Sequence, residues 1–250
     1  PENRALALSA LSSEQMKNVS IVYGTAENIL KGQYHQGDLK IAQGIVEGTT
    51  TGFFNPATNT LALVETASAE VISHELVHAT TLAVMIAEAQ GQLSDKGEYG
   101  LAVSQSVEAV KQNFFGMASA GMETSVSIVN KVSQDAFNNM MAAARSALNA
   151  DEATPLAQAF EQANPVEQAS ALNEFMSWGL TNRKNRALLK SQRVRTATQM
   201  VVKFIKTILF GKSTPPKVAS DALSQLEFHT LALMQAQKDM GSMNVTAALQ

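Results

Sequence analysis

The segment Ser68-Ala-Glu-Val-Ile-Ser-His-Glu-Leu-Val-His-Ala-Thr-Thr81 is apolar and helix-forming but is interrupted by ionisable side chains. His74 and His78 are four residues apart, so on a helix they lie one turn apart on the same face and can hold one metal ion. Glu75 points to one side of that metal, where it can accept a proton from a bound water. The spacing predicts a zinc site with two histidine ligands and Glu75 as the catalytic base.

A five-residue pattern with three fixed positions arises by chance in some helical proteins. The residues around the motif therefore help to distinguish a functional site from a chance match. Small and β-branched residues flank the motif: Ala69, Val71, Ile72, Val77 and Ala79. Burying ionisable groups in such a core-like helix is costly unless they are paired or bind a metal. The composition of the helix therefore favours a functional site.

A hairpin is predicted just before the metal helix, in Thr51-Gly-Phe-Phe-Asn-Pro-Ala-Thr-Asn-Thr-Leu-Ala-Leu-Val64. This segment is typical of a strand, an Asn-Pro turn and a second strand. It resembles the hairpin that zincins carry before their metal helix, in which an edge strand pairs with extended peptide substrate. The resemblance implies a substrate-binding strand made of Leu61, Ala62, Leu63 and Val64.

A catalytic zinc ion normally takes three protein ligands and a water, so a third ligand must come from elsewhere in the chain. In metzincins it is a histidine six residues beyond the second, but Val84 stands there and Thr81 replaces the required glycine. That subclass is excluded. Gluzincins use a glutamate on a later helix, for which Glu174 is the best candidate. Its helix is predicted from Asn164, with a capping box completed by Glu167, to residue 179 or 180.

The stretch Asn173-Glu174-x-x-Ser177 resembles the Asn-Glu-x-x-Ser stretch of thermolysin-like gluzincins, which implies that Glu174 is the third zinc ligand. The acid that normally follows is Trp178 here, so the partner of the His74 imidazole is not identified. Glu174 also follows His78 by 96 positions (174 − 78), which requires a helical insertion. The alternative is a solvated glutamate on an amphipathic helix.

A second resemblance covers residues 50–80 and 170–185. The stretches Gly-Phe-Phe-Asn-Pro-x-Thr-Asn-Thr, His-Glu-Leu-Val-His-Ala-Thr and Glu-Phe-x-x-Trp-Gly-Leu-Thr-Asn are similar to metallopeptidase-like modules embedded in large bacteriophage proteins. This implies a virion-associated protein delivered to the bacterial cytoplasm. Because the chain begins at Pro1 without methionine, we expect a fragment or processed product of a longer polypeptide whose other segments are partners.

Length and composition fit a globular domain. With 250 residues, of which 45% are hydrophobic, the chain is long enough to bury a core as a single domain. It contains no cysteine, so zinc has to be bound by histidine and carboxylate side chains. A net charge of -3 gives no electrostatic argument for nucleic acid, and no apolar run is long enough to span a bilayer.

Strand-forming segments concentrate before residue 66, at residues 19–23, 39–42, 45–48 and 61–64, and helix-forming segments fill the rest. We expect a zincin-like α+β fold, in which a small, mostly antiparallel N-terminal sheet precedes a predominantly helical remainder that carries the metal helix. We expect one zincin-like metallopeptidase domain over residues 1–250. Its parts are a sheet-rich part (1–65), the metal helix, helical insertion and ligand-glutamate helix (66–182), and C-terminal helices (183–250).

Four further features are candidates for a functional role, and three of them also allow a structural interpretation. His229 and Tyr99 can stabilise an oxyanion in the transition state, whereas a helix histidine satisfied by packing is the simpler interpretation of His229. The basic run at residues 183–195 is either a solvated helix face or a nucleic-acid contact, although no aromatic residues interleave it. The apolar helix expected at residues 199–210 either packs on the domain or lies on a membrane surface.

Together these features predict zinc-dependent hydrolysis of a peptide or protein substrate. One zinc ion held by His74, His78 and Glu174 would activate water, and Glu75 would take its proton and pass it to the leaving amine. The alternative is a non-catalytic, zincin-like structural or interaction module of a large phage protein.

Overall fold

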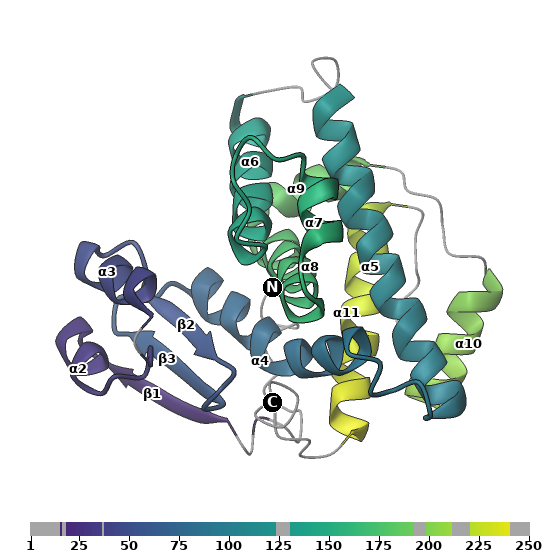
Figure 1. Cartoon of the computed structure of the whole chain (residues 1–250), viewed down its shortest axis with the longest axis horizontal. Helices are drawn as coiled ribbons and strands as arrows, with labels where there is room; N and C mark the ends of the chain where they lie inside the picture. Colours follow the sequence, from purple (N-terminus) through teal and green to yellow (C-terminus); the bar gives the residue numbers. More distant parts are fainter. Residues whose placement is uncertain are drawn as a thin grey trace.

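The computed structural model describes residues 16, 19–36, 38–123, 131–192, 199–211 and 221–240. A small sheet with two short helices occupies one end of the molecule, and the long helix α4 (Ala69–Ala89) runs from it into a body of helices (Figure 1). The strands are β1 (Ser20–Gly24), β2 (Gly52–Asn55) and β3 (Thr60–Val64). The other helices are α2 (Ala26–Lys31), α3 (Leu39–Glu47), α5 (Gly97–Glu123), α6 (Lys131–Ala147), α7 (Leu156–Gln162), α8 (Pro165–Thr181), α9 (Arg183–Ser191), α10 (Gln199–Phe210) and α11 (Ala222–Asp239). The expected α+β fold, with its sheet at the N-terminal end, is confirmed.

β3 lies in the middle of the sheet, whose strand order is β1-β3-β2. It pairs in parallel with β1 and antiparallel with β2, so the sheet is mixed and the prediction of a mostly antiparallel sheet is wrong. Successive side chains of a strand point to opposite faces. Leu61 and Leu63 accordingly join the main core with α4, while Ala62 and Val64 join a second cluster with α2 and α3. Both faces of β3 are therefore buried.

Residues 39–42 and 45–48, predicted as two strands, instead form the single helix α3. The Asp38 carboxylate accepts hydrogen bonds from two backbone N–H groups at its start, and Gly48 ends it with a left-handed φ of 72°. A short apolar run does not distinguish a buried strand from a helix, so these two end signals carry the decisive information. The strands predicted at residues 19–23 and 61–64 are confirmed as β1 and β3, with shifts of one residue.

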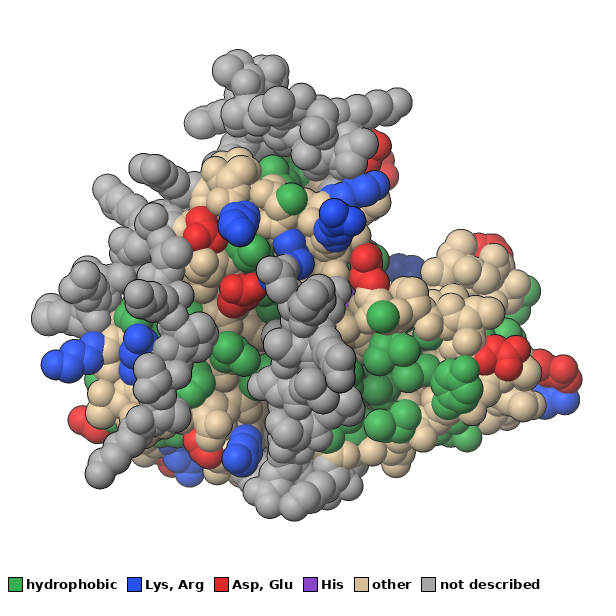
Figure 2. Space-filling model, turned by 180° about the vertical axis from the view of Figure 1, so that it is seen from behind, with side chains coloured by type: hydrophobic (Ala, Val, Ile, Leu, Met, Phe, Trp, Pro, Cys, Tyr) green, Lys and Arg blue, Asp and Glu red, His purple; other side chains and the backbone are tan. Residues whose placement is uncertain are grey.

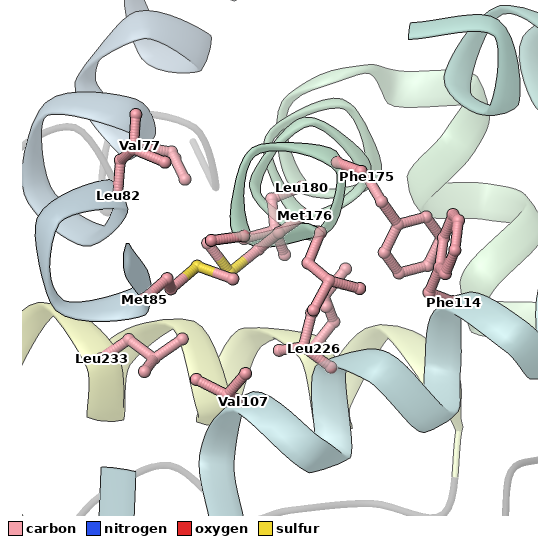
Figure 3. Packing of buried hydrophobic residues seen from close by; sticks show 14 of the residues in the cluster. Val77, Leu82, Met85, Val107, Phe114, Phe175, Met176, Leu180, Leu226 and Leu233 are labelled. Carbon is pink, nitrogen blue, oxygen red and sulfur yellow. The ribbon is translucent and has the colours of Figure 1, made fainter. Parts of the chain in front are cut away.

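The main core fixes α4 and α8 side by side. Residues Ser73 to Ala87 of α4 are all buried, as expected for a helix that is apolar on most sides. α8 is the main partner of α4, and α11 lies against both. Figure 3 shows Met85 of α4 meeting Met176 of α8, with Leu226 of α11 close by. This packing sets the positions of the residues that α4 and α8 contribute to the candidate site.

α8 begins as predicted, with a capping box in which Asn164 and Glu167 exchange hydrogen bonds. Helices α5, α6 and α7 fill the interval between α4 and α8, which agrees with the expected helical insertion. α10 packs on α5 and α11, so the interpretation of residues 199–210 as a helix packed on the domain is confirmed. No helix within the described ranges is long and apolar enough to cross a membrane.

The predicted basic run begins in α9, while residues 193–195 lie outside the described residues. Arg186 of this run is mostly buried, and its guanidinium donates to the Glu227 carboxylate at 2.8 Å and to the Leu180 carbonyl at 2.8 Å. On the face drawn in Figure 2, basic and acidic side chains lie intermixed. Arg186 thus serves to join α9 to α11 and α8.

Candidate metal centre

Packing of α8 against α4 brings the three predicted metal ligands together. The Nε2 atoms of His74 and His78 are 2.8 Å apart. The Glu174 carboxylate lies 3.4 Å from the first nitrogen and 3.5 Å from the second. Donor atoms from all three side chains lie within 4.8 Å of one another, a grouping that can hold a metal ion. The helical insertion thus folds so that residues distant in sequence share one site.

Asn173, the residue before Glu174, fixes the ring of His78. Its Nδ2 donates to the Thr81 hydroxyl at 2.8 Å, and that hydroxyl donates to a carbonyl one turn earlier on α4 at 2.7 Å. Asn173 Oδ1 therefore faces His78 Nδ1 as an acceptor. Nδ1 carries the proton, and the Nε2 lone pair is directed at His74 and Glu174. The sequence did not predict this role, for which the only signal was the position of Asn173 beside Glu174.

His74 is held by packing. Its ring contacts the indole of Trp178, with ring centroids 4.7 Å apart, and the edge of the His78 ring at 4.5 Å. Its Nδ1 is buried without a hydrogen-bond partner among the described residues. Trp178 stands where the thermolysin-like pattern has an acid, so an aromatic contact replaces the expected hydrogen bond to this imidazole.

Glu75 is buried next to the ligands. Burial raises the pKa of Glu75 to about 7, and Glu174 adds to the rise, while His78 and a hydrogen bond from the Phe54 backbone act to lower it. The Phe54 contact also joins the metal helix to β2. A carboxyl group whose pKa lies near neutrality is suited to accept and return a proton at physiological pH.

The pKa of Glu174 shifts in the opposite direction. Burial acts to raise its pKa, but His78 and a hydrogen bond from His74 outweigh burial and lower the pKa of Glu174 below its ordinary value. Two neighbouring carboxyl groups with pKa values pushed in opposite directions are typical of sites that give them different roles. The charged Glu174 suits a metal ligand, and Glu75 suits a proton carrier.

A cavity of about 260 Å³ opens onto these groups. Its walls are Glu70, Val71, His74 and Glu75 of α4, Glu174 and Trp178 of α8, and residues 49–52 at the start of β2. Gly52 lets β2 approach α4 closely, because a Cβ at this position would lie 2.7 Å from the Val71 side chain. The cavity therefore lies between the metal helix, the ligand helix and β2.

The predicted substrate strand, residues 61–64, is wrong, because β3 is hydrogen-bonded on both sides and has no free edge. The edge beside the cavity belongs to β2. Since the Val64 N–H donates to the Thr51 carbonyl, the alternation of an antiparallel pair turns the backbone groups of Gly52 and Phe54 away from β3. One of these groups, at Phe54, already contacts Glu75. An extended peptide can add to this edge of the sheet.

The two predicted transition-state stabilisers lie elsewhere. The Tyr99 hydroxyl donates to the Ala236 carbonyl and so joins α5 to α11. His229 is fully buried in α11 against Phe228, and burial lowers its pKa to about 4. Neither residue lines the cavity beside the ligands. The structure thus favours the packing interpretation of His229, and it makes Tyr99 a bridge between helices.

The donor set fits zinc. Two imidazole nitrogens and a carboxylate are the ligands of one common type of catalytic zinc site. The histidine–glutamate distances of 3.4 and 3.5 Å match the roughly 3.3 Å between tetrahedral ligands that lie about 2.0 Å from zinc. The two Nε2 atoms, at 2.8 Å, would separate by about 0.5 Å when they bind the ion. That change requires only a small rotation of the rings.

The chain is similar to part of a phage protein. It is 26% identical over 245 residues to the virion DNA-directed RNA polymerase of Enterobacteria phage N4. The alignment covers 95% of this chain and spans only 6% of that protein's length. No protein-family model matches the chain, and no solved structure matches it.

Proposed function

We propose that the chain hydrolyses peptide bonds with the help of one zinc ion, held by His74, His78 and Glu174. The observation that supports this most is that Glu75 lines the same cavity as His74 and Glu174, two members of the ligand cluster. Metal ligands alone would be equally compatible with a structural site. A buried carboxyl group with a pKa near 7 beside the ligands is the additional part that hydrolysis requires.

The chemistry divides between the metal and the chain. Zinc, when bound, supplies a water of lowered pKa and polarises the substrate carbonyl. The backbone N–H and carbonyl of Gly52, together with the carbonyl of Phe54, hold an extended peptide across the cavity as an added strand. Glu75 accepts a proton from the attacking water and delivers it to the leaving amine. The water oxygen becomes bonded to the carbonyl carbon as the C–N bond breaks, so all atoms of the water are retained in the two products.

Metal content and hydrolysis, measured on the same variants, test the proposal. We expect about one zinc per chain by mass spectrometry, and its loss in His78→Ala and Glu174→Ala. Glu75→Gln is expected to keep zinc but to cleave a fluorogenic peptide library at least about 100-fold more slowly. Glu161→Gln, exposed on α7, controls for the loss of a carboxylate and is expected to behave as the unaltered chain. Zinc binding without Glu75-dependent hydrolysis would favour the alternative of a structural module.

The similarity to a phage protein supports a proposal about where this activity takes place. We infer that the chain is a module of a large virion-associated phage protein that is delivered to the bacterial cytoplasm. The similarity runs along 95% of the chain, as a module of a longer polypeptide requires. The activity in the relative's name is RNA synthesis, yet none of the residues that line this cavity is a lysine or arginine able to bind nucleotide phosphates. The cavity thus fits a peptide better than a nucleotide.

A further inference from the structure

The end of the cavity beyond His74 carries a carboxylate that the zinc chemistry does not use. Three contacts pair α4 with α8 in antiparallel order: His78 with Asn173, the His74 ring with Trp178, and Glu70 with Asn182. Each step moves one turn farther from His78 along α4. Glu70 and the indole of Trp178 therefore stand together at one end of the cavity that they both line.

A hydrogen bond holds the Glu70 side chain in place, and no positively charged side chain among the described residues pairs with it. The Asn182 amide donates to its Oε1 at 2.8 Å, which fixes the carboxylate against α8. Among the described residues, no lysine or arginine forms an ion pair with Glu70, and none lines the cavity. The carboxylate is only partly buried, so it is accessible from the cavity.

Glu70 lies outside the group of residues that could hold a metal ion, which consists of His74, His78 and Glu174. Glu70 lies one turn before His74 on α4 and lines the same cavity as the indole of Trp178. A carboxylate combined with an indole face is a suitable environment for an organic cation, which gains both an ionic hydrogen bond and a cation–π contact.

We propose that Glu70 and Trp178 form a subsite for a cationic side chain, so that the substrates are peptides with arginine or lysine next to the cleaved bond. This inference rests on the proposed peptidase function for its biological meaning. The subsite itself consists of residues whose positions do not depend on catalysis.

Cleavage of two matched peptides gives the first test. The peptides differ only in arginine or its neutral analogue citrulline beside the cleaved bond. The unaltered chain is expected to show a kcat/KM for the arginine peptide about 10- to 100-fold higher than for the citrulline peptide, as expected for a charge-assisted hydrogen bond. Glu70→Gln keeps an acceptor for Asn182 and is expected to abolish that ratio. Glu65→Gln, an exposed carboxylate just before α4, should preserve it.

A binding measurement tests the subsite even if no peptide is cleaved. Trp178 is the only tryptophan of the chain, so its fluorescence reports on this position alone. N-acetyl-arginine amide is expected to change the fluorescence of the zinc-reconstituted chain saturably, and higher salt should weaken the effect. N-acetyl-citrulline amide should bind at least about 10-fold more weakly. Glu70→Gln should remove the difference.

The two measurements separate the failure of each proposal. Arginine-selective binding without any hydrolysis would uphold the subsite and overturn the peptidase. Hydrolysis with equal rates for arginine and citrulline peptides, and equal binding of the two amides, would uphold the peptidase and overturn the subsite. Neither hydrolysis nor selective binding would overturn both.

Discussion

The two histidines of the candidate metal centre lie one turn apart on α4 but are supported in different ways. His78 donates to Asn173, which in turn donates to Thr81, so hydrogen bonds fix both its orientation and its tautomer. His74 is oriented by the ring of Trp178, and its Nδ1 has no partner among the described residues. Orientation and tautomer are therefore separate properties, and α8 controls both for only one of the two histidines.

A third buried histidine extends the comparison. Both ring nitrogens of His229 are buried without a hydrogen-bond partner in the described part of the chain. Within the described part of the chain, His229 belongs to no group of residues that could hold a metal ion, and no hydrogen bond orients its ring. The molecule thus contains one histidine supported by hydrogen bonds, one supported by a ring contact, and one that only packing surrounds. Each type of support predicts a different response to mutation.

The largest effect is expected from the pH dependence of His229. Its pKa falls from 6.5 to about 4 on burial, so between these pH values the unfolded chain binds a proton and the folded chain does not. The free energy of unfolding should fall by about 3 kcal/mol as the pH drops from 6.5 to 4, and the contribution is absent above pH 6.5. His229→Leu should remove this part of the slope in denaturant unfolding measured across that range.

A loop histidine gives the control for this slope. His35→Gln, in the turn after α2, removes an imidazole from outside α11 and should leave the difference between the His229→Leu and unaltered profiles in place. Parallel profiles of the unaltered chain and His229→Leu would show that His229 already titrates normally in the folded state. The histidine would then have a hydrogen-bonded partner, and the contrast with His78 would disappear.

The same contrast shows how far the sequence could predict the site. His74, His78 and Glu174 were identified because a helical spacing and a local motif determine which residue types can bind a metal. The role of Asn173 depends on α4 and α8 lying side by side, and the free edge at β2 depends on β3 being the central strand. Neither relation is local in sequence. α3 was mistaken for two strands because a short apolar run fits both structures.

The second-largest effect is expected on zinc affinity when the hydrogen bond that supports His78 is removed. Asn173→Leu has a similar volume but cannot accept the His78 Nδ1 proton, so the lone pair at Nε2 is no longer enforced. We expect zinc affinity to fall about 10- to 100-fold, measured by competition with a chelator. Ser177→Ala is the matched control, because Ser177 Oγ is buried in the same helix and has no partner among the described residues. Equal losses in both variants would indicate general damage to α8 instead.

The smallest effect has the opposite sign and concerns His74. Trp178→Asp would place a carboxylate where the thermolysin-like pattern has one, and this carboxylate can accept the proton of the unpartnered His74 Nδ1. We expect zinc to bind about 10-fold more tightly, because the tautomer of the second ligand would then also be fixed before binding. Trp178→Leu removes the ring without adding an acceptor and should not tighten binding. If both substitutions weaken binding equally, packing by the indole is itself the required support, and the two ligands differ in kind but not in strength.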